Sequence, residues 1–211
     1  MPKATKDEIE VIKQYIKNDN EKFLILEQFV KMVLNENKKH NLIGNNTENN
    51  IWTRHVIDSL QLVDFIQNEE TIIDLGSGAG FPAIVLNIAT NKQTILIEKS
   101  PVKAKFLQNV INTLKLNAEV KNEVLTKKNF KNFAIKNSVV VSRAFKSIQE
   151  ILDLLSNDKN VDKVVLLKGK TWQEEIKKVN NNILNNWNYS VKQSILGEGV
   201  ILEFKRKDST K

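Results

Sequence analysis

The 211 residues of the chain carry a formal net charge of +7 at pH 7, and 41% of them are hydrophobic. This length and apolar content suffice for one full core, so we expect one α/β domain with an extension. The chain contains no cysteine, which excludes disulfides, cysteine-ligated zinc and thiol nucleophiles and permits a reducing compartment. The basic excess fits a polyanionic partner such as nucleic acid, although lysines on a solvated surface would produce the same excess.

The sequence shows no sign of export or of membrane insertion. Its first residues, MPKATKDEIE, are polar and charged, unlike a signal peptide. No apolar run approaches the roughly 20 residues that a membrane span needs. We therefore expect a cytoplasmic protein with no membrane partner.

The sequence predicts helices in the first part of the chain. Apolar residues recur there at helical spacing, and a polar, asparagine-rich loop follows the second helix. We expect residues 1–68 to form a helical extension packed on the main domain, residues 69–207, in one compact unit. The helices are expected at 5–18, 21–37 and 51–67, with the loop at 38–50.

From residue 71 onward, apolar strands alternate with helices. This alternation predicts an α/β fold with a mostly parallel sheet covered by helices on both faces. The last two strands, joined near the sequence GEG, predict a hairpin that adds an antiparallel strand. Strands are expected at 71–75, 93–98, 118–121, 138–142, 163–168, 188–195 and 199–206, and helices at 82–90, 101–116, 147–156 and 172–184.

The segment IIDLGSGAGFP at 72–82 leads from the first strand into a helix through three closely spaced glycines. In a doubly wound sheet, the loop after the first strand lies at the ligand-binding edge. The dinucleotide pattern G-x-G-x-x-G would need glycine where Phe81 stands, and a P-loop would need a lysine that residues 71–91 lack. A phosphate ligand is therefore disfavoured, while a turn with a purely structural role stays open.

Two carboxylates indicate what kind of ligand this loop would bind. Asp74 directly precedes the glycines, where it would repel a pyrophosphate but would suit a ligand with positive charge. Glu98 ends the next apolar strand, where a carboxylate can accept both hydroxyls of a ribose, unless it is an ordinary strand-end charge. A ribose joined to a cationic group without phosphate describes S-adenosylmethionine, the cofactor we expect.

Several motifs resemble those of one methyltransferase family. DLGSGAG and ILIE look like motifs I and II of class I S-adenosylmethionine-dependent methyltransferases, and the full set resembles the RsmG (GidB) family over roughly residues 25 to 206. The resemblance implies a Rossmann-like class I methyltransferase fold and methylation of N7 of one guanosine in the 530-loop region of bacterial 16S rRNA. The motifs are KKHNLIG at 38–44, RHVIDSL at 54–60, DLGSGAGFPAIVL at 74–86, KAKFL at 103–107, VSRAF at 141–145 and LLKG at 166–169.

The resemblance also implies which residues contact the cofactor. The chain departs from the family pattern at Leu125, where an acidic residue is frequent, and in GEGVILEF, where an arginine usually follows the glycine. With Asp74 added for its charge, the expected cofactor contacts are Asp74, Gly76, Gly78, Phe81, Glu98, Val124, Leu125 and Arg143.

The remaining residues limit the chemistry of methyl transfer. Carbon-5 methylation of pyrimidines uses an enzyme thiol, which this chain lacks. Methylation of exocyclic amines commonly uses an Asn/Asp-Pro-Pro-aromatic motif, but VSRAF stands in its place. Guanine N7 has an in-plane lone pair and no proton, so its methylation needs no general base and can rest on alignment with the methyl group.

Arg143 is the candidate catalytic residue, because it ends a buried strand at the open edge of the sheet. A salt bridge to Asp74 or Glu98 is the alternative role. Arg54 and His55 are candidates for RNA contact, although their motif could equally tie the extension to the core, with Asp58 as the i,i+4 partner of Arg54. The expected RNA contacts are Arg54, His55, Arg143 and Lys168, where a solvated strand end is equally plausible for Lys168.

Other functions stay open at this point. The two histidines and the absence of cysteine make a metal site improbable. The alternatives are a methyltransferase for another acceptor, a non-catalytic RNA-binding ribosome-assembly factor and, least favoured, an NAD oxidoreductase. The expected partner is 16S rRNA, within the small ribosomal subunit or an assembly intermediate, and the expected oligomeric state is a monomer.

Overall fold

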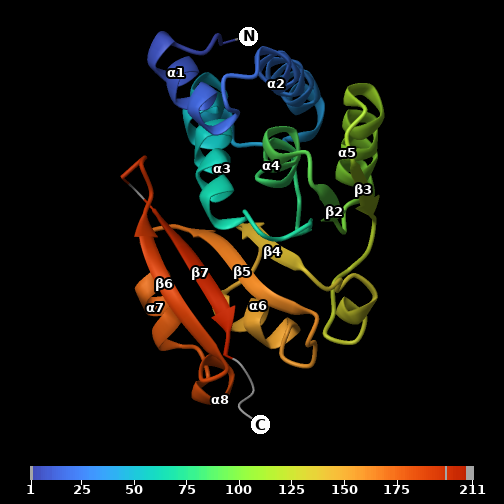
Figure 1. The fold of residues 1–211 in the computed structure, drawn as a ribbon. Coiled ribbons are helices and arrows are strands. Elements are labelled where there is room, and N and C mark those ends of the chain that lie inside the picture. The colour runs from blue at the N-terminus through green and yellow to red at the C-terminus, as the bar shows by residue number, and fades with distance from the viewer. Residues whose placement is uncertain (1, 198, 208–211) are drawn as a thin grey trace.

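The computed structural model describes residues 2–197 and 199–207 and contains one seven-stranded sheet (Figure 1). The strand order is β3-β2-β1-β4-β5-β7-β6, in which β1 to β5 are parallel and β7 is antiparallel to both of its neighbours. All seven predicted strands are confirmed. They are β1 (Thr71–Leu75), β2 (Gln93–Ile97), β3 (Ala118–Lys121), β4 (Ser138–Arg143), β5 (Val161–Lys168), β6 (Trp187–Gln193) and β7 (Val200–Arg206).

The helices begin at residues whose side chains satisfy free backbone N–H groups. Thr5 and Ser147 each form a capping box with a glutamate three residues later, and Ser100 caps a helix whose first residue is proline. The regular helices are α1 (Lys6–Tyr15), α2 (Asn20–His40), α4 (Ala83–Thr90), α5 (Pro101–Leu114), α6 (Ile148–Leu154), α7 (Trp172–Lys177) and α8 (Asn181–Leu184).

Two of the predicted helices are not continuous. The prediction of one α-helix over 51–67 is wrong, because this stretch forms a π-helix, η2 (Trp52–Ile57), then α3 (Asp58–Leu60) and a 3-10 helix, η3 (Gln61–Phe65). The predicted helix over 172–184 is interrupted, because Asn180 leaves helical conformation and its side chain caps α8. Part of the predicted loop is also ordered, as the 3-10 helix η1 (Asn45–Asn50).

Helices cover both faces of the sheet. On one face, α1, α2 and η2 share a hydrophobic cluster with α4 and α5, so the extension and the main domain bury side chains together (Figure 1). On the other face, α6 packs on the sheet with α7 and α8 at its border.

In the described part of the chain, no helix combines the length and the apolar composition needed to cross a bilayer.

Candidate functional site

Two cavities adjoin at the carboxyl ends of the parallel strands. The strand order reverses between β1 and β4, which is where doubly wound sheets bind ligands. The glycine-loop cavity, about 740 Å³, contains Gly76, Gly78 and Glu98 in its wall, and the arginine cavity, about 770 Å³, contains Arg54 and Lys168. The two cavities share a wall formed by His55, Arg143, Ala144, Phe145, Lys146 and Glu150.

The glycine loop requires its glycines. The backbone of Gly76 has φ +74°, and a Cβ there would lie 2.3 Å from Cδ2 of Phe145. Gly80 has φ +96°, and a Cβ there would lie 2.7 Å from Cγ1 of Ile84 in α4. Two amides of the loop, those of Gly76 and Ser77, donate to the carbonyl of Ile97 at the end of β2. The loop is therefore fixed to the sheet with its backbone exposed to the cavity.

Glu98 connects the glycine loop to the end of β2. One carboxylate oxygen accepts a hydrogen bond from the amide of Gly78 at 2.9 Å, and the other accepts from the amide of Ser100 at 2.8 Å. A carboxylate has about four lone-pair positions, so two further hydroxyl donors can bind on the cavity side. Glu98 is thus more than a strand-end charge, because it is buried and forms part of the cavity wall.

Asp74 is completely buried, and neither of its carboxylate oxygens has a hydrogen-bond partner among the described residues. Burial is the main cause that raises the pKa of Asp74 to about 7; the nearby Ser77 side chain and the charge of Arg143 oppose the rise, and the charge of Glu98 adds to it. The described residues that line the glycine-loop cavity do not include Asp74. Its carboxylate therefore lies behind the cavity wall and would need a cationic ligand or a shift of the loop to gain a partner.

The other expected cofactor contacts lie on the wall of the glycine-loop cavity. Phe81 is buried between Phe29 of α2 and the ring of His55, with centroid distances of 5.1 and 4.9 Å. Val124 and Leu125 follow β3, and Val124 is exposed at the cavity mouth. The structure thus brings together residues from three strand ends and from the extension.

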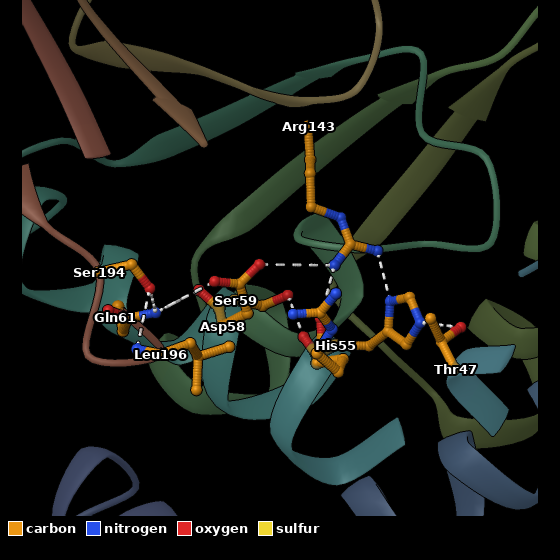
Figure 2. A network of polar contacts seen from close by, with 9 residues as sticks. Thr47, His55, Asp58, Ser59, Gln61, Arg143, Ser194 and Leu196 are labelled. Atoms are coloured by element: carbon orange, nitrogen blue, oxygen red, sulfur yellow. Dashed lines mark hydrogen bonds and ion pairs between the residues drawn. The ribbon is translucent and has the colours of Figure 1, made fainter. Parts of the chain in front are cut away.

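Arg143 ends β4 and is held by the extension (Figure 2). Its Nη2 donates to Nδ1 of His55 at 2.7 Å, and its Nη1 donates to the carbonyl of Arg54 at 3.1 Å. Nη1 also lies 3.7 Å from Oδ2 of Asp58, so the ion-pair partner is Asp58 and not Asp74 or Glu98. The guanidinium lies above the Phe81 ring, 5.3 Å from its centroid. Arg143 is therefore a preorganised cation in the wall between the cavities.

His55 is a neutral imidazole in this arrangement. Burial, together with the charges of Arg143 and Arg54, lowers its pKa to about 3. Because Nδ1 accepts from Arg143, Nε2 carries the proton and donates to Oγ1 of Thr47 at 2.9 Å (Figure 2). Both ring nitrogens are thus used within the protein, which favours a bracing role for His55 over direct RNA contact.

The network continues to the β6–β7 hairpin through residues that sequence reasoning missed. Nε2 of the buried Gln61 donates to Oδ1 of Asp58 and to Oγ of Ser194, both at 3.2 Å (Figure 2). Oε1 of Gln61 accepts from the amide of Ile195 at 2.8 Å. Ser194 also lines the arginine cavity. No motif in the sequence marks this contact, because its partners lie 133 residues apart.

The two other expected RNA contacts, Arg54 and Lys168, both line the arginine cavity. Nζ of Lys168 donates to the carbonyl of Lys146 and pairs with Glu175 at 2.8 Å, and its side chain is only 10% exposed. Lys168 is therefore neither a solvated strand end nor an uncompensated cation. A phosphate would have to compete with Glu175 for it.

This arrangement suits the transfer of a group between two bound molecules. Each cavity has the volume of a small-molecule site, and the shared wall is thin enough for single side chains to line both sides. Among residues 2–197 and 199–207, no group of three or more histidine, aspartate or glutamate side chains could hold a metal ion. Because Arg143 lies in the wall that both cavities share, these residues can align two ligands beside a fixed cation.

Known proteins resemble this chain in sequence and in fold. The model of the GidB family, described as rRNA small subunit methyltransferase G, matches residues 22–197. The ribosomal RNA small subunit methyltransferase G of Rickettsia akari is 40% identical over 180 residues, which cover 84% of this chain and 91% of that protein.

Two solved structures show the same fold at low identity. The ribosomal protein L11 methylase of Lactobacillus delbrueckii subsp. bulgaricus aligns with a TM-score of 0.55 at 15% identity, covering 78% of this chain and 81% of that one. The precorrin-6y C5,15-methyltransferase of Geobacter metallireducens aligns with a TM-score of 0.53 at 14% identity, covering 71% and 87%. Both are methyltransferases by name, and the likeness shows a shared fold.

Proposed function

We infer, because the chain belongs to the rRNA small subunit methyltransferase G family, that it transfers a methyl group from S-adenosylmethionine to 16S rRNA. The acceptor is N7 of one guanosine in the 530-loop region. The observation that best supports this function is the pair of adjoining cavities. The glycine-loop cavity is lined by the glycine loop and Glu98, and the arginine cavity is lined by cationic side chains. The donor and the acceptor can thus meet at their shared wall.

We propose that the glycine-loop cavity holds S-adenosylmethionine, which supplies an electrophilic methyl group when bound. The free lone pairs of Glu98 would accept the ribose hydroxyls, while Val124 and Leu125 border the adenine. Gly76, Gly78 and Phe81 would contact the remainder of the cofactor. The partnerless carboxylate of Asp74 fits a ligand that carries an amino group and a sulfonium, because a nearby cation would lower its free energy.

We propose that the acceptor guanosine enters the arginine cavity. Its N7 needs no general base, so the protein has only to exclude water and align N7 with the methyl group. Arg143 would donate to guanine O6 or to a phosphate, since a hydrogen bond to N7 itself would occupy the reacting lone pair. Arg54 would add positive charge near the RNA backbone, and Lys168 would do so if released from Glu175.

The protein would act as a monomer in the cytoplasm, on rRNA within the small subunit or an assembly intermediate. Its net charge of +7 supports association with a polyanion. Lysines near the arginine cavity and in the exposed end of α2 would extend the RNA contact around the cavity. They are Lys38, Lys39, Lys146 and Lys170.

Methyl transfer from labelled S-adenosylmethionine tests this function directly. The substrates are 16S rRNA and 30S particles from cells that lack the modification, and the product nucleoside is identified after digestion. We expect 7-methylguanosine at one site. Binding of S-adenosylmethionine without transfer to either substrate would point to another acceptor, and loss of cofactor binding would contradict the assignment of the glycine-loop cavity.

A further inference from the structure

Phe145 lines both cavities, yet neither the motifs nor the polar network assigns it a role. We propose that the acceptor guanine stacks on the Phe145 ring, which would make Phe145 the residue that sets the plane of the base for methyl transfer. This inference rests on the proposed function, because it assumes that a guanosine enters the arginine cavity.

The position of the ring is fixed on its cofactor side. It packs directly on the backbone of Gly76, where an added Cβ would overlap Cδ2 at 2.3 Å. The preceding residue, Ala144, has φ +53°, a conformation that residues other than glycine adopt at a cost of about 1–2 kcal/mol. A strained residue at this point directs Phe145 back over the glycine loop instead of into the following helix.

The acceptor side of the ring has the surroundings of a base-binding surface. Phe145 is partly exposed, and Nζ of Lys146 lies over its ring, 5.7 Å from the centroid, as a cation that contacts the aromatic face. The arginine cavity, about 770 Å³, has room for a nucleotide. A base that leaves an RNA helix loses its stacking partners, and an aromatic ring replaces them at a gain of about 1–3 kcal/mol per base.

Stacking would solve the alignment problem that N7 methylation poses. The N7 lone pair lies in the plane of the base, so the methyl group must approach within that plane. A ring that stacks on the base fixes this plane but leaves rotation within it free. Arg143, held by His55 and Asp58 in the same shared wall, would fix that rotation through O6 or a phosphate. Two residues of the VSRAF motif, Arg143 and Phe145, thus supply complementary constraints.

Matched variants of Phe145 separate base stacking from a purely structural role. Phe145→Leu keeps an apolar side chain but removes the aromatic face, whereas Phe145→Tyr keeps that face. We expect Phe145→Leu to lower kcat/KM for the rRNA by about 5-fold to 150-fold, the ratio that corresponds to loss of one stacked base. Phe145→Tyr should stay within about threefold of the wild type, and both variants should bind S-adenosylmethionine within about threefold of the wild-type Kd.

The possible outcomes of this experiment are distinct. If the wild-type protein does not methylate the rRNA, the proposed function fails. If it does and Phe145→Leu methylates equally well, stacking on Phe145 is excluded. A loss of cofactor affinity as large as the loss of kcat/KM would also overturn the proposal, since Phe145 would then serve the glycine-loop cavity. Equal losses of kcat/KM in Phe145→Leu and Phe145→Tyr would also overturn the proposal.

Discussion

The guanidinium of Arg143 has structural partners as well as a proposed catalytic role. It donates to His55 and to the carbonyl of Arg54, and it pairs with Asp58. A catalytic role alone would mean that loss of Arg143 affects turnover far more than stability. The contacts change this expectation, because without Arg143 the buried His55 and the half-buried Asp58 lose a partner.

We predict that Arg143→Met abolishes methyl transfer and also lowers the free energy of unfolding by about 2 kcal/mol. Arg206→Met is the matched control. Arg206, the last residue of β7, donates to the carbonyls of Leu155 and of Val161, the first residue of β5, whereas Arg143 lies beside the other end of that strand. The control variant should lose comparable stability and retain transfer per folded molecule. Denaturant unfolding measures the loss of stability, and single-turnover kinetics measure the rate of methyl transfer. If Arg143→Met transferred the methyl group at the wild-type rate, Arg143 would not be part of the catalytic site.

The raised pKa of Asp74 means that the stability of the folded protein should depend on pH. Its pKa is about 7 in the folded protein, against 3.8 for an unperturbed aspartate, so the folded protein retains a proton that the unfolded chain releases between these values. The free energy of unfolding therefore falls as pH rises from about 4 to about 7, by up to roughly 4 kcal/mol, and the penalty is constant above that range.

Asp74→Asn should lack this pH dependence. Relative to the wild type, the variant should become progressively more stable from about pH 4 to about pH 7, and the difference should stay constant above that range. Its affinity for S-adenosylmethionine should fall because the carboxylate is gone. Denaturant unfolding of both proteins across this pH range, with calorimetric cofactor titration, provides the measurement. Parallel stability curves would show that Asp74 is ionised in the folded protein throughout.

Among the structural elements, the β6–β7 hairpin depends on the extension for its position at the arginine cavity. The side chain of Gln61 in η3 bonds to Ser194 and to the amide of Ile195, and both contacts are buried or partly buried. Leu196 packs against the hydrophobic cluster of the extension helices, and Lys192 of β6 pairs with Asp64 of η3. The wall of the arginine cavity is thus assembled from two ends of the chain.

We predict that Gln61→Met frees the hairpin tip, because methionine cannot replace either hydrogen bond. Amide exchange at Ser194 and Ile195 should accelerate, and KM for the rRNA should rise several-fold with little change in cofactor affinity. Gln193→Met is the control. Among the described residues, the Gln193 side chain donates only to carbonyls of the same hairpin, those of Gly197 and Gly199. Equal KM values in the two variants would contradict a role for the contact.

At the scale of the whole molecule, the helical extension and the main domain share one core. Phe29 of α2 is fully buried, packs on Phe81 and lies beside Gly80 of the glycine loop. We therefore propose that residues 1–68 and 69–207 fold as one cooperative unit. A single unit would transmit a defect in α2 to β4 and β5, whose buried residues lie outside the hydrophobic cluster of α2.

Phe29→Ala tests this cooperativity. The substitution should lower the free energy of unfolding by about 3–5 kcal/mol, the usual effect of truncating a buried phenylalanine. Native-state hydrogen exchange should show the same decrease for amides in α2 and for amides in β4 and β5. A decrease confined to α2 would show that the extension unfolds independently.

The sequence by itself determined the architecture and the kind of site. Alternating strands and helices, the three glycines and the positions of Asp74 and Glu98 are local patterns, and local patterns predict elements and the loops between them. The VSRAF and RHVIDSL motifs likewise indicated the family before any contact was visible. These features are properties of short segments, so the linear order of residues suffices to recognise them.

Only the tertiary structure decided how the site residues are paired. Arg143 meets His55 across 88 residues and takes Asp58 as its ion-pair partner, while Lys168 is bound to Glu175. Apolar spacing also could not distinguish the π-helix at Trp52–Ile57 from an α-helix, because both bury one side while differing in hydrogen-bond register. Such partners and registers depend on packing between distant segments, which one linear sequence does not specify locally.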